Sequence, residues 1–292
     1  MAELIIVLGP TAVGKTDYSI DLALDCGSPV ISCDSRQIFK EMRIGTAQPS
    51  AEQLSRVRHY FIASRSVTEP YTAGLYELDA LALLDELFKT HGRLVMTGGS
   101  GLYIDALCDG LDAFPQVDPA IRESLVRRLE EEGLASLRFE LQRLDPQTYD
   151  SIDLANRQRI VRALEVCIGT GRPFSSFKSA SKAQRPFAIT KIGLQRPREE
   201  LYERIDRRVD EMIAEGLEAE VRSLLPYRDL PALRTVGYSE MFDYIDGKIP
   251  FEETVRLIKR NTRHYAKKQM SYWRRDPAIC WKDISCLSRR GI

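Results

Sequence analysis

Residues 9–16, with the sequence GPTAVGKT, constrain the fold of this 292-residue chain more than any other segment. They match the pattern G-x-x-x-x-G-K-[ST] in full, and they stand between an apolar run, Leu4–Leu8, and a helical pattern from about Lys15 to Leu24. A strand, a glycine-rich turn and a helix N-terminus in this order form a phosphate-binding loop, whose backbone amides cradle anionic oxygens. The sequence therefore predicts an α/β protein that binds a di- or triphosphate.

Two side chains of this loop have roles that follow from their chemistry. Lys15 supplies positive charge to the terminal phosphates, and the hydroxyl of Thr16 can ligate Mg²⁺. We therefore expect Mg²⁺ as the cofactor. The expected phosphate-binding residues are Gly9, Pro10, Thr11, Ala12, Val13, Gly14, Lys15 and Thr16.

Short apolar runs alternate with helical patterns before and after the middle of the chain. Further strands are predicted at 29–33, 93–97 and 190–194, and further helices at 73–89, 199–225 and 251–272. This alternation predicts a parallel sheet with helices on both of its faces.

The middle of the chain has a different character. Between about residues 115 and 182 the periodicity is helical, and no segment has a convincing strand pattern. One helix is expected from Asp118 to about Glu132, and another from about 154 to 168. We therefore predict an all-helical insertion domain at 115–187 within an α/β domain formed by 1–114 and 188–292.

Polar residues follow two of the predicted strands. Asp34 begins the segment Asp-Ser-Arg-Gln after the second strand, and Gly98 begins Gly-Gly-Ser-Gly-Leu-Tyr after the third. Ligands of parallel sheets bind at the carboxyl ends of the strands, so both segments are expected to face the phosphate loop. A turn or helix-capping role explains a lone aspartate equally well. The run 94–97 has no carboxylate, which disfavours a motor-type ATPase but leaves small-molecule kinases open.

Charge is balanced over the whole chain but not locally. The 42 basic and 42 acidic residues cancel, whereas the segment 254–275 has eight Lys or Arg residues, His264 and no acid. Aromatic residues are interleaved there, which indicates binding to an RNA backbone. An amphipathic surface helix is the alternative interpretation.

Location and assembly are predicted from simpler features. No apolar run approaches membrane-spanning length, and no leader pattern precedes the first strand. Six cysteines, at 26, 33, 108, 167, 280 and 286, are scattered without zinc-ligand spacing. We expect a cytoplasmic protein with no membrane partner. Nothing indicates an obligate dimer, so a monomer is expected.

Several segments together resemble tRNA dimethylallyltransferases. They occur in the family's order over nearly the whole chain, at residues 9–16, 34–37, 44–47, 98–103, 156–165, 208–221, 236–238 and 265–269. The resemblance implies a P-loop-kinase-like core and a helical insertion that grips the anticodon stem-loop. It implies transfer of a dimethylallyl group from dimethylallyl diphosphate to the exocyclic amine of the adenine 3′-adjacent to the tRNA anticodon, with release of diphosphate.

The resemblance also implies roles for individual residues. Asp34 matches the catalytic carboxylate, and Ser100 stands where the family usually has threonine. The expected catalytic residues are Asp34, Ser100, Lys15 and Arg208. The expected tRNA-binding residues are Asp34, Ser35, Arg36, Gln37, Ser100, Arg122, Gln158, Arg159, Ile160, Val161 and Arg162. A solvated helix face is the alternative interpretation for Arg159 and Arg162.

Two other functional classes share some of these features. A small-molecule kinase using ATP has the same loop, fold and Mg²⁺, but needs neither a basic C-terminal helix nor an arginine-rich insertion. A non-catalytic RNA-binding or GTPase-like switch protein is disfavoured, because the guanine-specific pattern N-K-x-D is absent from the sequence.

Overall fold

The chain folds into two compact units. The structure, a computed structural model, describes residues 2–178 and 182–285, and Cys286 lies outside them. An α/β unit runs to Asp109 and resumes at Gln184, and a second unit spans Gly110–Ala183. The sequence pattern places the corresponding borders at 115 and 187. In the described residues, no helix is both long and apolar enough to cross a membrane.

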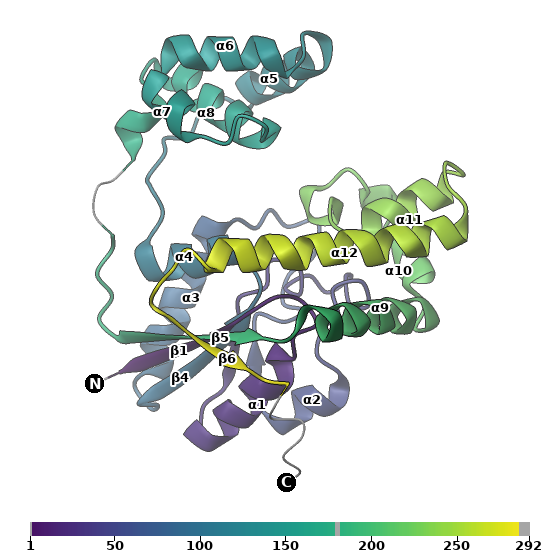
Figure 1. The fold of residues 1–292 in the computed structure, drawn as a ribbon. Coiled ribbons are helices and arrows are strands. Elements are labelled where there is room, and N and C mark those ends of the chain that lie inside the picture. The colour runs from purple at the N-terminus through teal and green to yellow at the C-terminus, as the bar shows by residue number, and fades with distance from the viewer. Residues whose placement is uncertain (1, 179–181, 286–292) are drawn as a thin grey trace. The chain divides into compact units, whose positions relative to one another are not determined.

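A parallel sheet forms the centre of the α/β unit (Figure 1). Its described strands have the spatial order β3-β2-β4-β1-β5-β6, and every pairing between neighbours is parallel. The strands are β1 (Glu3–Leu8), β2 (Val30–Ser32), β3 (His59–Tyr60), β4 (Arg93–Gly98), β5 (Ala188–Gln195) and β6 (Ile279–Asp283). Because β2, β4, β1 and β5 are consecutive neighbours, the segments that follow them meet along one edge of the sheet.

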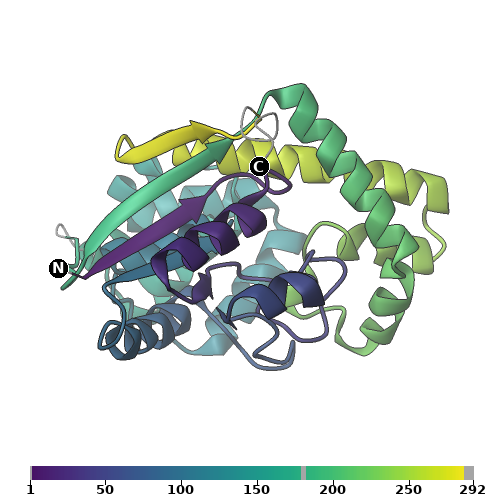
Figure 2. The same ribbon diagram turned by 90° about the horizontal axis from the view of Figure 1, so that it is seen from below.

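Helices cover both faces of this sheet. Those of the α/β unit are α1 (Lys15–Cys26), α2 (Ala51–Arg56), α3 (Ala73–Leu87), α4 (Gly101–Asp109), α9 (Arg198–Ala214), α10 (Leu217–Ser223), α11 (Tyr238–Ile245) and α12 (Phe251–Trp273). Short 3₁₀ turns occur at Leu225–Tyr227 and Pro231–Leu233. Figure 2 shows α1 lying over the strands on the face turned to the viewer.

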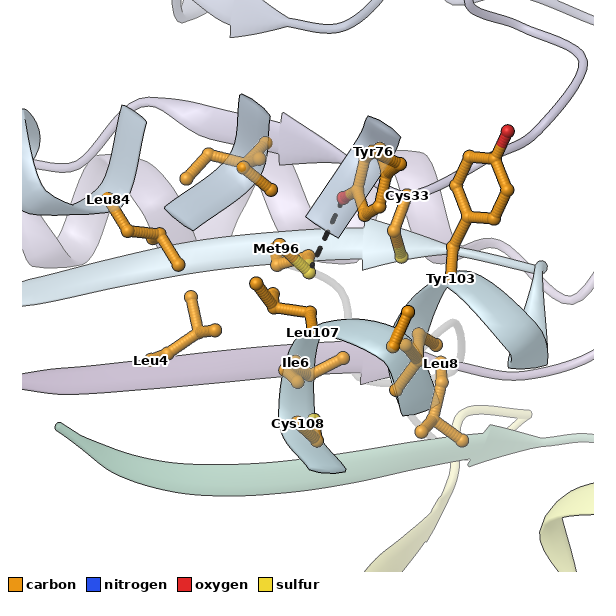
Figure 3. Packing of buried hydrophobic residues seen from close by; sticks show 14 of the residues in the cluster. Leu4, Ile6, Leu8, Cys33, Tyr76, Leu84, Met96, Tyr103, Leu107 and Cys108 are labelled. Atoms are coloured by element: carbon orange, nitrogen blue, oxygen red, sulfur yellow. Dashed lines mark hydrogen bonds between the residues drawn. The ribbon is translucent and has the colours of Figure 1, made fainter. Parts of the chain in front are cut away.

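The central strand β1 alternates between the two faces. Leu4, Ile6 and Leu8 pack with residues of α3 and α4, including Tyr76 and Leu107 (Figure 3). Ile5 and Val7 pack on the opposite side with residues of α1 and α9. A strand buried on both faces has no polar alternation, which is why the run at 4–8 is continuously apolar. The phosphate loop therefore starts from the most buried strand of the sheet.

The second unit has its own hydrophobic core. Its helices are α5 (Pro119–Glu131), α6 (Leu134–Leu144), α7 (Pro146–Ser151) and α8 (Arg157–Thr170), followed by a 3₁₀ turn at Phe174–Phe177. Leu125, Leu137, Leu141 and Leu164 are among the residues that pack together. The Asp-Pro pairs at 118–119 and 145–146 each place a capping carboxylate before a proline in the first turn. The expected helical character of this region is confirmed.

Three sequence-based predictions of secondary structure need correction. The helix expected at 199–225 is two helices, because the chain turns at Gly216, whose φ is 99°. Strands β3 and β6 were not predicted. The first has only two residues, and the second, ICWKD, ends in charges and has no clear period of two. The predicted strands at 4–8, 29–33, 93–97 and 190–194 are present as β1, β2, β4 and β5.

Candidate active site

The phosphate loop connects the carboxyl end of β1 to the N-terminus of α1. Gly14 is the N-cap of α1 and has a φ of 108°, so the turn brings the amides of the first helical residues to the loop. These amides have no partner within the helix, and the helix dipole adds positive potential at the same point. The loop is therefore built to hold an anion.

Three arginines from the second half of the α/β unit hold the other side of this loop. Arg196 Nε donates to Val13 O and Arg204 Nε donates to Ala12 O, both at 2.8 Å. Arg208 donates to Thr11 Oγ1 at 3.2 Å. With the carbonyl oxygens of residues 12 and 13 bound to arginines, the loop is fixed. Arg196 also pairs with Glu200, whereas Arg204 and Arg208 form no ion pair within the described residues.

Lys15 and Arg208 are partly buried cations that form no ion pair within the described residues. Lys15 Nζ donates to Gly9 O and Pro10 O, each at 2.9 Å. Desolvation lowers the pKa of Lys15 to about 8; Asp34 opposes this shift and Arg208 adds to it. Burial lowers the pKa of Arg208 as well, and Arg204 adds to that shift. A bound polyanion would favour the charged forms of both groups and so offset their desolvation and their mutual repulsion.

Asp34 lies at the end of β2, two strands from the loop. Its Oδ1 accepts hydrogen bonds from the backbone amides of Arg36 at 2.9 Å and Gln37 at 3.2 Å. This is the turn-capping role that the sequence left open. Asp34 Oδ2 makes no hydrogen bond within the described residues, so the carboxylate keeps one oxygen for a ligand while the other fixes its orientation.

The segment after β4 is tied to both neighbours. Ser100 Oγ accepts from Ser35 N at 2.9 Å and donates to Ser35 Oγ at 3.0 Å, so in this structure it links two strand ends. Gln269 of α12 donates to Gly99 O and accepts from Thr11 N, both at 2.9 Å. A Cβ at Gly99 would fall 2.6 Å from Gln269 Nε2, so only glycine permits this bridge.

Two adjoining hollows meet at Asp34. The first, the phosphate pocket, is lined mainly by polar residues, among them Lys15, Thr16, Asp17, Arg204 and Gln269. The second, the side cleft, has apolar walls from Val209, Met212, Val236 and Ile258. Both hollows are lined by Thr11, Asp34, Thr46, Ala47, Arg208 and Tyr265. The arrangement can hold an anion at one end and an apolar or ring-shaped group at the other, with a carboxylate where they join.

The other residues expected at strand ends are partly occupied by structural contacts. Arg36 lines the side cleft, and its guanidinium reaches Ser35 O and Pro231 O at 3.3 and 3.4 Å. The amide of Gln37 donates to Thr46 O at 3.1 Å and to Ala47 O at 2.8 Å. In this structure Gln37 therefore holds a neighbouring loop and leaves only its carbonyl oxygen for a base edge.

The candidates in the insertion divide into exposed and buried side chains. Gln158 and Arg159 are exposed in the first turn of α8. Arg122 and Arg162 both pair with Glu165, at 2.9 and 3.0 Å. Ile160 and Val161 were expected to contact tRNA, but only 0% and 3% of their surfaces are exposed. Their side chains pack in the insertion core, so the RNA-facing candidates of this helix are its polar residues.

Some site residues were not identified from the sequence. Arg196, Arg204 and Gln269 act on the phosphate loop from more than 180 residues away in the chain. The spacing of Arg204 and Arg208, four residues apart on one helix, was an available signal, because such residues share a helix face. Gln269 lies in a segment that the resemblance included without assigning it a role.

Comparisons with known proteins identify the family of this chain. The family model described as IPP transferase matches residues 37–276. A tRNA dimethylallyltransferase of Porphyromonas gingivalis is 52% identical over 278 residues, covering 95% of this chain and 93% of that protein. One of Parabacteroides distasonis is 49% identical over 281 residues, covering 96% and 94%. The crystal structure of the full-length tRNA isopentenylpyrophosphate transferase of Bacillus halodurans superimposes with a TM-score of 0.71 at 35% identity, covering 97% and 90%.

The fold and site define a P-loop α/β protein with a helical insertion, built around an anion pocket and a carboxylate. The chain belongs to the IPP transferase family, as the family model and the two relatives at about half identity show.

The lowered pKa of Lys15 predicts a pH dependence of anion binding. Below about pH 8 the ammonium group is charged, and above it the charge is lost unless a ligand restores it. The dissociation constant for inorganic diphosphate should therefore rise as pH increases above 8, by up to about tenfold per pH unit. Isothermal titration between pH 7 and 9.5 measures this dependence.

Lys15→Arg is the matched control, because a guanidinium does not titrate in this range. The ionisation of diphosphate itself affects both proteins equally, so the difference between their pH profiles reports Lys15 alone. Equal pH profiles for the wild type and Lys15→Arg would contradict the assignment of the titration to Lys15.

Proposed function

We propose that this protein transfers a dimethylallyl group from dimethylallyl diphosphate to the exocyclic amine of the adenine 3′-adjacent to a tRNA anticodon, releasing diphosphate. The observation that carries the proposal is that the partly buried cations Lys15 and Arg208 line the same pocket as the free oxygen of Asp34. The names of the relatives support the reaction class. Family membership disfavours the alternative, a small-molecule kinase using ATP.

The diphosphate end of the donor fits the phosphate pocket. As the carbon–oxygen bond of the donor breaks, negative charge grows on the departing diphosphate. The loop amides, Lys15 and Arg208 are already oriented around the loop before that charge appears. Preorganised donors of this kind stabilise a transition state, and each typically contributes about 3–4 kcal/mol.

The pocket also fits the proposed Mg²⁺. Thr16 lines the same pocket as Lys15, and its hydroxyl oxygen is the kind of donor that Mg²⁺ prefers. Thr16 is therefore the proposed protein ligand. A bound Mg²⁺ would neutralise part of the leaving-group charge.

Asp34 is proposed to activate the acceptor. The exocyclic amine of adenine is a weak nucleophile because its lone pair is delocalised into the ring. A fixed carboxylate oxygen within hydrogen-bond reach orients the amine and accepts its proton as the nitrogen–carbon bond forms. The hydrogen bonds from the amides of Arg36 and Gln37 to Oδ1 hold the carboxylate in place for this role. Ser100 is proposed to help hold the Asp34 segment in place, because its hydroxyl hydrogen-bonds to the adjacent Ser35.

The tRNA is proposed to contact the α/β unit at its strand ends and to contact the insertion. A stacked loop base must be extruded to reach a pocket, at a cost of a few kcal/mol. Ser35, Arg36 and Gln37 follow Asp34 directly, where the neighbouring bases would lie. Gln158 and Arg159 offer amide and guanidinium groups to base edges or phosphates. Arg122 and Arg162 both form ion pairs with the single carboxylate of Glu165, and they are proposed as phosphate contacts.

The basic segment at 254–275 contains two different halves. Arg256, Lys259 and Arg263 pair with Glu253, Asp210 and Asp206. Arg260, between them, forms no ion pair but donates to Asn261 Oδ1 at 3.1 Å. In contrast to the first group, His264, Lys267, Lys268, Arg274 and Arg275 form no ion pair within the described residues. We call these last five residues the free basic segment. Its charge is available to phosphate groups, so it is the proposed contact with the RNA backbone.

The proposed working form is a cytoplasmic monomer with tRNA and dimethylallyl diphosphate as its partners. Asp34, Lys15, Ser100 and Arg208 all come from one α/β unit of one chain, which supports the proposed monomer.

Replacing Asp34 tests the proposed base. In Asp34→Asn the side-chain oxygen still accepts the two turn amides, but the group no longer takes up a proton at neutral pH. We expect transfer to fall by about 10²- to 10⁴-fold, with tRNA and diphosphate affinity close to wild type. Single-turnover transfer and equilibrium binding measure the two effects, and Asp25→Asn, at an exposed site on α1, is the control. Near-wild-type turnover would remove Asp34 from the mechanism.

The proposed role of the free basic segment predicts that its residues contribute more to tRNA binding than the ion-paired residues of the same helix. Lys267→Ala and Lys268→Ala should each weaken tRNA binding and reduce the salt slope of the binding constant by about one. Arg256→Ala and Lys259→Ala, at ion-paired positions, should change the affinity and the salt slope little. Binding measured at several salt concentrations checks this. Equal losses at paired and free positions would contradict the assignment.

A further inference from the structure

Parts of three segments of the family resemblance have no role in the mechanism above. They are Ile44–Ala47, Glu220 and Tyr238. The structure brings them together at one carboxylate, that of Glu220 on α10. Glu220 Oε2 accepts from Ile44 N at 2.7 Å, and Oε1 accepts from Gly45 N at 2.9 Å and from the Tyr238 hydroxyl at 2.6 Å. A carboxylate that accepts hydrogen bonds from two consecutive backbone amides and a phenol holds that backbone in place. We call Glu220 and Tyr238 together the clamp.

Tyr238 is held permanently as a donor in this clamp. It is fully buried, and burial together with the neighbouring charge of Glu220 holds the pKa of its hydroxyl well above the usual range. Its ring also presses on the clamped segment. A Cβ at Gly45 would fall 2.5 Å from the Tyr238 ring, so any other residue at this position would push the segment away.

The opposite edge of the same segment is fixed from the strand-end turn. Gln37 Nε2 donates to Thr46 O and Ala47 O. Gln48 Nε2 returns hydrogen bonds to Gln37 O at 3.0 Å and Phe39 O at 2.8 Å. Ala47 is held at a φ of 49°, a left-handed conformation that a residue with a Cβ adopts only when its surroundings impose it. The segment is therefore restrained on both sides.

This restrained segment is a wall of the reaction site. Gly45, Thr46 and Ala47 line the side cleft together with Asp34 and Arg208. Its amides at 44 and 45 are occupied by Glu220, so they are not donors for a ligand. The segment contributes shape and position, not charge.

We propose that Glu220 and Tyr238 are positioning residues for the transfer reaction. They act through the segment 44–47, which they hold in place as the wall of the cleft where the prenyl carbon and the adenine amine must meet. This inference rests on the proposed function. Alignment errors of about 1 Å can reduce a rate by about 100-fold, so a clamp that touches no substrate still controls the rate.

Two variants and one control test the clamp. Glu220→Gln replaces one acceptor oxygen with an amide that opposes a backbone N–H, and Tyr238→Phe removes only the hydroxyl. Glu218→Gln is the matched control, because Glu218 lies on the same helix and pairs with Arg222 at 2.7 Å on its exposed side. Hydrogen exchange at the amides of Ile44 and Gly45 reports the clamp directly.

We expect faster exchange at residues 44 and 45 and a single-turnover transfer rate lower by about 10- to 100-fold in Glu220→Gln. Tyr238→Phe should show the same changes to a smaller degree, and Glu218→Gln should match wild type. Inorganic diphosphate should bind all four proteins within about twofold, because the loop amides, Lys15 and Arg208 are unaltered.

Parallel loss of diphosphate binding and transfer would show a general structural role and overturn the inference. Faster exchange with unchanged transfer would overturn it as well. A wild-type chain that transfers no prenyl group would overturn the proposed function and this inference with it. An active wild type and an equally active Glu220→Gln variant would overturn this inference alone.

Discussion

The structure depends on an excess of positive charge fixed at the end of its most buried strand. Arginines bind the outer carbonyls of the phosphate loop, Lys15 and Arg208 crowd its ligand side, and burial lowers the pKa of both. Holding these charges together without an anion costs free energy, and a bound diphosphate would recover it. The same arrangement serves a leaving group as well as a transferable phosphoryl group, because both develop negative charge at the same place.

This constraint explains why the N-terminal motif needs the C-terminal half of the chain. The parallel sheet order places β5 beside β1, so the segment after β5 brings Arg196 and the start of α9 to the loop. Helix α12 adds Gln269, which joins the loop to the segment after β4. The clamp at Glu220 extends this logic to the cleft, since α10 and α11 fix a wall that begins near residue 44.

Patterns of local origin were predictable from the sequence. The phosphate loop, four of the strands and the helical insertion follow from apolar runs, caps and glycines, which act over a few residues. The partners of these elements were not predictable, because Arg204 meeting Ala12 or Gln269 meeting Thr11 depends on the order of strands in the sheet. The division of the basic segment into paired and free halves depends on Asp206 and Asp210 of a different helix. Ile160 and Val161 were placed by resemblance, and their burial follows from packing.

In the proposed reaction, the phosphate loop holds the diphosphate as it leaves the prenyl carbon, and an adenine amine forms the new bond to that carbon. Purified protein incubated with unmodified tRNA and dimethylallyl diphosphate, with nucleosides then analysed by mass spectrometry, tests it most directly. We expect one dimethylallyl adenosine next to the anticodon for each diphosphate released, and no product when ATP replaces the donor. Unmodified nucleosides, or passage of the terminal phosphate of ATP to an acceptor, would contradict it.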